Sequence, residues 1–100
     1  MYIAMNRFKI KNGKEDTFEE IWKNRDTHLK KVPGFMDFHL LKGETENDYT
    51  LYASHTIWES KNDFVAWTKS EEFRKAHQGA GKHNDIYMSH PKFEGFETVL

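Results

Sequence analysis

The order in which apolar patterns follow one another constrains the fold of this chain more than any other feature. Alternating patterns typical of strands occupy residues 2–10, 35–42, 49–58 and 92–100, and helical patterns lie between the first two and the last two of them. The order strand, helix, strand, strand, helices, strand predicts a ferredoxin-like α+β sandwich built from a split βαβ pattern. In this fold the helices cover one face of an antiparallel sheet. Several of the strands are apolar on both faces, so we expect a second copy, packed sheet to sheet, to cover the other face.

The composition limits the class of protein. The 100 residues predict a single domain, residues 1–100. The absence of cysteine excludes disulfides, thiolate metal ligands, a cysteine nucleophile and a c-type haem attachment. The longest apolar run, Met1 to Met5, is too short for a membrane span or a signal peptide, so we expect a soluble, cytoplasmic protein. The formal net charge of −1, with both signs interspersed, does not favour binding to nucleic acid or membranes.

Aromatic residues are unusually frequent, at 15 of 100. They can fill a small core or line a pocket for a flat ligand. Within the first strand, Asn6 is the unusual member of an apolar face, between Ala4 and Phe8. Asparagine is disfavoured in strands, and a buried amide without a partner costs about 1–3 kcal/mol. Asn6 is therefore either an edge or bulge residue that faces water, or a donor held for a ligand.

The segment after the first strand predicts one amphipathic helix. Asn12 and Gly13 form a turn in which Asn12, with Glu15, can cap the helix. The helix has a single apolar stripe, Lys30 and Lys31 suit its last turn, and Pro33-Gly34 ends it. The stripe, which is most simply core, consists of Phe18, Ile21, Trp22, Leu29 and Val32. The next two strands predict a hairpin with a turn at residues 43–48, and the default interpretation of its histidines, His39 and His55, is structural.

Residues 63–77 predict two short helices in succession. Ser60 with Asp63 is typical of a helix start, and Ser70 starts the second helix. Phe64 and Trp67 share a face of the first helix, and Phe73 and His77 share a face of the second. Such a histidine is more often a packed or capping residue than a metal ligand, and such a tryptophan is more often core than site. The polar, glycine-rich segment 78–91 is long for a connector and is a candidate binding loop.

With these segments placed, the chain resembles the IsdG-type haem-degrading monooxygenases of the antibiotic biosynthesis monooxygenase superfamily, over nearly its whole length. Pro33-Gly34-Phe35 and Trp58-Glu59-Ser60 are common across the superfamily and indicate only the fold. The more specific motifs are Asn6 in the first strand, Phe64-Val65-Ala66-Trp67, and Phe73-Arg74-Lys75-Ala76-His77. The combination of Asn6, Trp67 and His77 resembles the triad of the haem-degrading branch.

The resemblance implies a homodimeric β-barrel in which each protomer binds one haem as both substrate and cofactor. His77 would be the axial ligand of the iron through a neutral imidazole. Trp67 would press on the porphyrin and distort it, and Asn6 would donate its amide N–H to dioxygen on the opposite side. Phe64 and Phe73 would contact the haem. The implied reaction uses O2 and external electrons to open the porphyrin ring and release iron. Because no nucleotide-binding glycine motif is present, a separate reductase would deliver the electrons.

Three alternatives remain open. His83, six residues after His77, could be the axial ligand, although a helical position is better preorganised than a glycine-flanked loop. The chain could instead be a cofactorless monooxygenase of the same superfamily that oxidises an aromatic substrate. It could also be a haem carrier without enzymatic activity.

Overall fold

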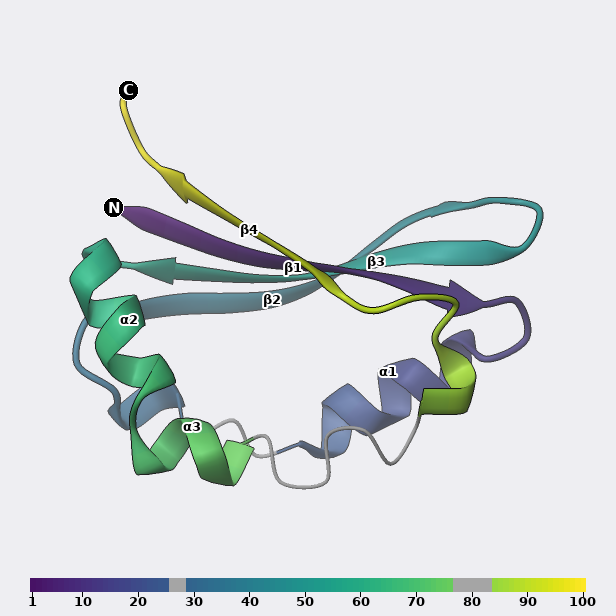
Figure 1. Ribbon diagram of the computed structural model, residues 1–100, viewed down its shortest axis with the longest axis horizontal. Coiled ribbons are helices and arrows are strands. Elements are labelled where there is room, and N and C mark those ends of the chain that lie inside the picture. Colours follow the sequence, from purple (N-terminus) through teal and green to yellow (C-terminus); the bar gives the residue numbers. More distant parts are fainter. Residues whose placement is uncertain (26–28, 77–83) are drawn as a thin grey trace.

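The computed structural model describes residues 1–25, 29–76 and 84–100. It contains an antiparallel sheet, three α-helices and two 3-10 helices (Figure 1). In chain order the elements are β1 (Tyr2–Lys11), α1 (Glu15–Asn24), η1 (Leu29–Lys31), β2 (Phe35–Thr45), β3 (Tyr49–Trp58), α2 (Lys61–Thr68), α3 (Glu71–Ala76), η2 (Asn84–Ile86) and β4 (Lys92–Glu97).

The four strands form one sheet in the order β2-β3-β1-β4, with every neighbouring pair antiparallel. The helices lie on one side of this sheet, which confirms the predicted ferredoxin-like α+β fold (Figure 1). The sheet of the single chain is open, with β2 and β4 at its edges. A barrel would need a second copy, so the dimeric barrel stays a prediction.

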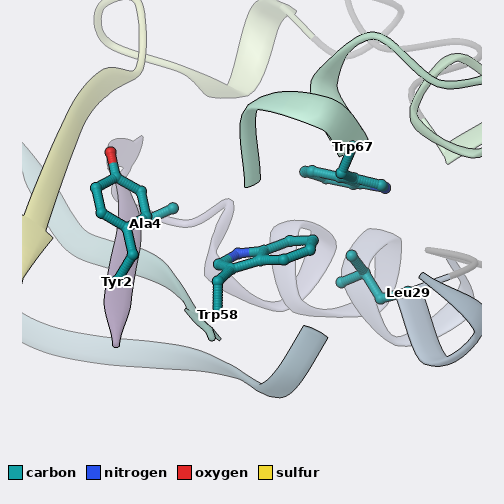
Figure 2. Packing of buried hydrophobic residues seen from close by; sticks show 5 residues of the cluster. All are labelled: Tyr2, Ala4, Leu29, Trp58 and Trp67. Atoms are coloured by element: carbon teal, nitrogen blue, oxygen red, sulfur yellow. The ribbon is translucent and has the colours of Figure 1, made fainter. Parts of the chain in front are cut away.

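The alternating side chains of β1 and β3 decide which residues form the core. Every second residue of β3, from Thr50 to Trp58, is buried, and its register partners on β1 face the same helical layer. The core has two clusters. The first comprises Tyr2, Ala4, Leu29, Trp58 and Trp67, and Figure 2 shows the Trp67 ring of α2 lying over Trp58 of the sheet. The second comprises Phe8, Ile10, Phe18, Tyr52 and Ile86.

The predicted single helix after the first strand is wrong in its extent and in its cap. The α-helix ends at Asn24, because Arg25 has extended backbone angles, and Leu29 lies in the separate turn η1. Leu29 is nevertheless buried in the first cluster, as the apolar stripe predicted. Asn12 does not cap α1; its amide donates to the carbonyl oxygens of Glu46 and Asn47 in the β2–β3 turn, at 3.3 and 2.7 Å. The Asn12 side chain, which local spacing assigned to the helix cap, therefore makes a long-range contact instead.

The two short helices form as the sequence predicted. The hydroxyl of Ser60 accepts a hydrogen bond from the Asp63 N–H at 3.2 Å and so caps α2. Ser70 accepts from the Phe73 N–H at 3.1 Å at the start of α3. Gly34, which has φ of +83°, precedes β2, and a Cβ at this position would lie 2.4 Å from the side chain of Asp63. Among the described helices, none combines the length and the apolar character needed to cross a membrane.

The outer strands and the last connector differ from the predicted ones. β2 continues to Thr45 and is irregular at two places, between Phe35 and Asp37 and between Lys42 and Thr45, and Met36 at the first of them is exposed. β4 ends at Glu97. The described end of the candidate binding loop is partly anchored in the core, because Ile86 is buried in the second cluster and Tyr87 forms a bridge to Ile10.

Replacing Tyr52 with phenylalanine is expected to lower the free energy of unfolding by about 1–2 kcal/mol. Burial, with the hydrogen bond that its hydroxyl donates to Glu19 at 2.5 Å, raises the pKa of Tyr52 above 10.0, so the hydroxyl stays protonated and donates at neutral pH. Tyr49→Phe is the matched control on the same strand, because no hydrogen bond of the Tyr49 hydroxyl is found among the described residues. Urea unfolding of both variants measures the difference, and equal losses would contradict a role for the Tyr52–Glu19 bond.

Candidate functional site

A cavity of about 270 Å³ lies between the sheet and the helices. Its volume is near the lower end of the range of about 300–1,000 Å³ typical of small-molecule sites. Six of its thirteen lining residues are aromatic, and they come from five different elements. These residues are Trp22, Phe38, Phe64, Trp67, Phe73 and Phe93.

The aromatic rings of the cavity pack against one another in pairs with well-defined geometry. Trp22 of α1 stacks on Phe38 of β2, with centroids 5.6 Å apart and planes 21° apart. Phe64 of α2 stacks on Phe93 of β4, at 5.6 Å and 10°. Trp67 contacts Phe73 edge to face at 4.8 Å. Flat, apolar faces are therefore available from several sides, which suits a flat, apolar ligand.

One cation lines this cavity among the residues that the structure describes. The Arg25 guanidinium lies over the Trp22 ring, 4.4 Å from its centroid, in a cation–π contact. No ion pair of Arg25 occurs within the described part of the chain. Its positive charge is also felt at Tyr87, where burial raises the pKa and Arg25 opposes the increase. The cavity thus offers a positive charge to an anionic substituent of a ligand.

Asn6 lies in the middle of the cavity's sheet wall. It belongs to the inner strand β1, with Ser54 of β3 opposite it on one side and Phe93 of β4 on the other. Its side chain makes no hydrogen bond to any described residue. The hypothesis that Asn6 faces water from an edge or a bulge is wrong, because β1 is central and its pairing is regular at this point.

The structure brings most of the predicted site residues together. Asn6, Phe64, Trp67 and Phe73 line the same cavity although they are up to 67 positions apart in the sequence. His77, the predicted iron ligand, and its alternative His83 lie outside the described residues. Their predicted roles, and those of the four residues above, remain predictions.

His39 and His55 belong to the opposite face of the sheet. They are register partners on β2 and β3, with ring centroids 6.3 Å apart, and they alternate with the residues that face the helices. Neither lines the cavity. Within residues 1–25, 29–76 and 84–100, no group of three or more His, Asp or Glu side chains is placed to hold a metal ion.

Among the cavity residues that were not identified as site residues from the sequence, Trp22, Arg25 and Ser54 bear most on ligand binding. Trp22 was assigned to the core, but it is only half-buried, and its indole N–H is buried without a hydrogen-bond partner among the described residues. Ser54 could have been found from the alternation of β3, because it shares a face with Tyr52 and Trp58. The position of Arg25 depends on where α1 ends, for which the sequence carries no clear signal.

Comparison with known proteins agrees with the fold. The sequence profile described as "Antibiotic biosynthesis monooxygenase" matches residues 1–79. A haem oxygenase (staphylobilin-producing) of Staphylococcus saprophyticus is 32% identical, over 82% of this chain and 78% of its own length. A haem-degrading monooxygenase of Shouchella clausii is also 32% identical, over 99% of this chain and 92% of its own.

A solved structure extends this likeness to three dimensions. The haem degrader MhuD of Mycobacterium tuberculosis, with two haems bound in its active site, superposes with a TM-score of 0.77. It is 26% identical, and the match covers 100% of this chain and 97% of MhuD. The chain therefore belongs to the antibiotic biosynthesis monooxygenase family, together with the haem-degrading monooxygenases.

Proposed function

We propose that this protein is a haem-degrading monooxygenase, which binds haem in the aromatic cavity and cleaves the porphyrin ring with O2 and external electrons, releasing iron. One observation carries the proposal. Asn6 and Trp67, the two described members of the predicted triad, lie on the wall of one cavity together with five further aromatic residues. The relatives named for haem degradation support the same activity.

Two features of the described residues support haem as the ligand. The stacked pairs Trp22–Phe38 and Phe64–Phe93 present flat faces to a macrocycle. Arg25 would attract the carboxylates of the propionate groups. Because the cavity of about 270 Å³ is small for a whole porphyrin, part of the ligand would extend through the opening or displace lining side chains.

Each triad residue would have a separate task. His77 would hold the iron through a neutral imidazole nitrogen, a role that neither His39 nor His55 can take from the opposite face of the sheet. Trp67, held by Trp58 at 5.4 Å and Phe73 at 4.8 Å, would press on the porphyrin as a rigid surface. Asn6 would direct its amide N–H toward the ligand, and an amide stays uncharged at any working pH. Bound haem would supply the redox-active iron at which O2 reacts.

We also propose a homodimer in which the uncovered faces of two sheets pack together. The side chains on this face are largely apolar and half-buried in the single chain, and they are Ile3, Met5, Leu51, Ala53 and Ile57. Phe96 and Leu41 are 47% and 42% exposed. Burial of so apolar a surface would favour association. Sedimentation analysis should give twice the chain mass, and a monomer at micromolar concentration would contradict this arrangement.

We place the protein in the cytoplasm, where a separate reductase would supply the electrons.

A haemin titration tests the proposed function. The protein should develop a Soret band that saturates at one equivalent per chain. The band should then disappear under ascorbate and air with catalase present, because catalase removes the peroxide that degrades haem non-enzymatically. A protein that stays colourless would be consistent with the cofactorless monooxygenase, and a stable band under turnover conditions would indicate a carrier.

Asn6→Ala is expected to bind haemin with an affinity close to that of the original protein but to degrade it much more slowly. The amide contributes a hydrogen bond to the reacting side of the ligand and little apolar area. Loss of one preorganised donor at a reacting centre typically costs a factor of about 10²–10³ in rate. Single-turnover decay of the Soret band measures the rate of haem degradation. Full activity of this variant would remove Asn6 from the mechanism.

A further inference from the structure

The polar groups on the sheet wall of the cavity are not equivalent, and one of them has no assigned role. Ser54 lies directly opposite Asn6 in the register of β1 and β3, on the face that the helices cover. Side chains of directly opposite residues in antiparallel strands have Cβ atoms about 4.5–5.5 Å apart. The Ser54 hydroxyl and the Asn6 carboxamide are therefore neighbours on the wall of the same cavity.

The other hydroxyl groups of the cavity already have partners. Thr56 donates to the Ala4 carbonyl oxygen at 3.2 Å and accepts from the indole N–H of Trp58 at 2.9 Å. Thr68 donates to the Val65 carbonyl oxygen at 2.6 Å. The Ser54 hydroxyl has no hydrogen-bond partner in the described ranges of the chain, although the residue is only 7% exposed. Its hydrogen-bonding capacity is thus directed into the cavity, as is that of Asn6.

The Ser54 hydroxyl is not among the fully enclosed polar atoms that lack a partner, and the residue lines the cavity, so the hydroxyl is available to a partner within that space. The aromatic rings around the pair offer no acceptor of comparable strength. A strong acceptor directly opposite in the register is the carboxamide oxygen of Asn6, and rotation of the serine side chain between staggered rotamers would bring its hydroxyl toward that oxygen.

We propose that Ser54 is a positioning residue whose hydroxyl donates to the carboxamide oxygen of Asn6, directly or through one water, when the cavity is filled. This bond selects one of the two orientations of the amide, namely the one in which the NH2 group faces the ligand. Ser54 thereby acts on the ligand only through Asn6. The inference rests on the proposed function, because the ligand that Asn6 would face is taken to be haem.

The test uses carbon monoxide bound to the reduced, haem-loaded protein, because the C–O stretching frequency reports donors that face the ligand. Ser54→Ala should shift this frequency toward that of Asn6→Ala. It should also weaken cyanide binding to the ferric protein by about threefold to tenfold, the effect of one neutral hydrogen bond. Ser54→Thr, which keeps the hydroxyl, should have the C–O frequency and the cyanide affinity of the original protein.

A double-mutant cycle and a structural control separate positioning from stability. In the Asn6→Ala background, Ser54→Ala should cause no further shift, since its target is gone. Thr50→Val removes a buried hydroxyl from the same strand outside the cavity, where it donates to Glu15 at 2.9 Å. It should lower the melting temperature and leave the C–O frequency unchanged.

Two results would overturn the inference. A Ser54→Ala frequency equal to that of the original protein would show that the hydroxyl does not act on the ligand. An equal shift in both backgrounds would show that it acts without Asn6. If the unaltered protein fails to take up haemin, the proposed function itself is rejected, and the assignment of Ser54 falls with it; haem uptake with either of the first two results rejects only the role of Ser54.

Discussion

His77→Ala is expected to reduce haem affinity by at least about 100-fold, because removal of groups that merely support a metal ligand already costs about 10- to 100-fold. The described wall of the cavity offers flat faces, one cation and four uncharged polar side chains, but no imidazole. Stacking alone would retain some haemin, with a broader and weaker Soret band. The measurement is a haemin titration of the variant beside the original protein.

Two further variants make the His77 result specific. His39→Ala removes an imidazole from the opposite face of the sheet and should leave haem binding unchanged. His83→Ala tests the alternative ligand. If His83→Ala abolishes the Soret band and His77→Ala preserves it, the two assignments must be exchanged. Since His77 would hold the iron as a neutral imidazole, haem should also dissociate as the pH falls well below about 6.5, where protonation competes with iron.

Trp58→Ala is expected to cause the largest loss of stability, about 3–5 kcal/mol. Trp58 is the largest fully buried side chain, with an exposed fraction of 0%. Its ring contacts Phe35 and Phe64, each at 5.7 Å, and its indole N–H donates to Thr56. Since small domains are stable by only about 5–15 kcal/mol, the melting temperature should fall by at least about 12 °C.

Thermal unfolding followed by circular dichroism measures this change, with Trp58→Phe as control. The phenylalanine ring keeps most of the apolar contacts and loses the indole N–H, so its cost should be closer to about 1–2 kcal/mol. A Trp58→Ala protein that melts within a few degrees of the original would contradict the packing described for the first core cluster. Because Trp58 also supports Trp67, the alanine variant should bind haem less tightly than its residual fold alone would predict.

Features that depend on neighbours along the chain could be predicted from the sequence. The alternation of β3 correctly separates Leu51, Ala53 and Ile57 from Tyr52 and Trp58, because the side-chain period of a strand is 2. The caps at Ser60 and Ser70 form within three residues, and both are as predicted. The strand order then follows from the few topologies open to this pattern of elements.

Features that depend on distant partners were missed. Asn12 satisfies carbonyl groups some 35 positions away, so local spacing could not identify its partner. Arg25 reaches the cavity only because α1 ends one residue earlier. Ser54 has significance only through Asn6, and the two residues meet through the register of β1 and β3, which no local motif encodes. Site residues that belong to a local sequence motif could therefore be proposed from the sequence. Site residues that come together only through the register of two strands could not.

Gly34 affects how closely a cavity-lining helix packs. It lies outside the cavity, yet its missing side chain leaves the space that Asp63 occupies in the first turn of α2. The same helix carries Phe64 and Trp67. A larger residue at position 34 would have a strained backbone at φ of +83° and would force Asp63 to shift, so glycine here allows the first turn of α2 to pack closely beside the start of β2.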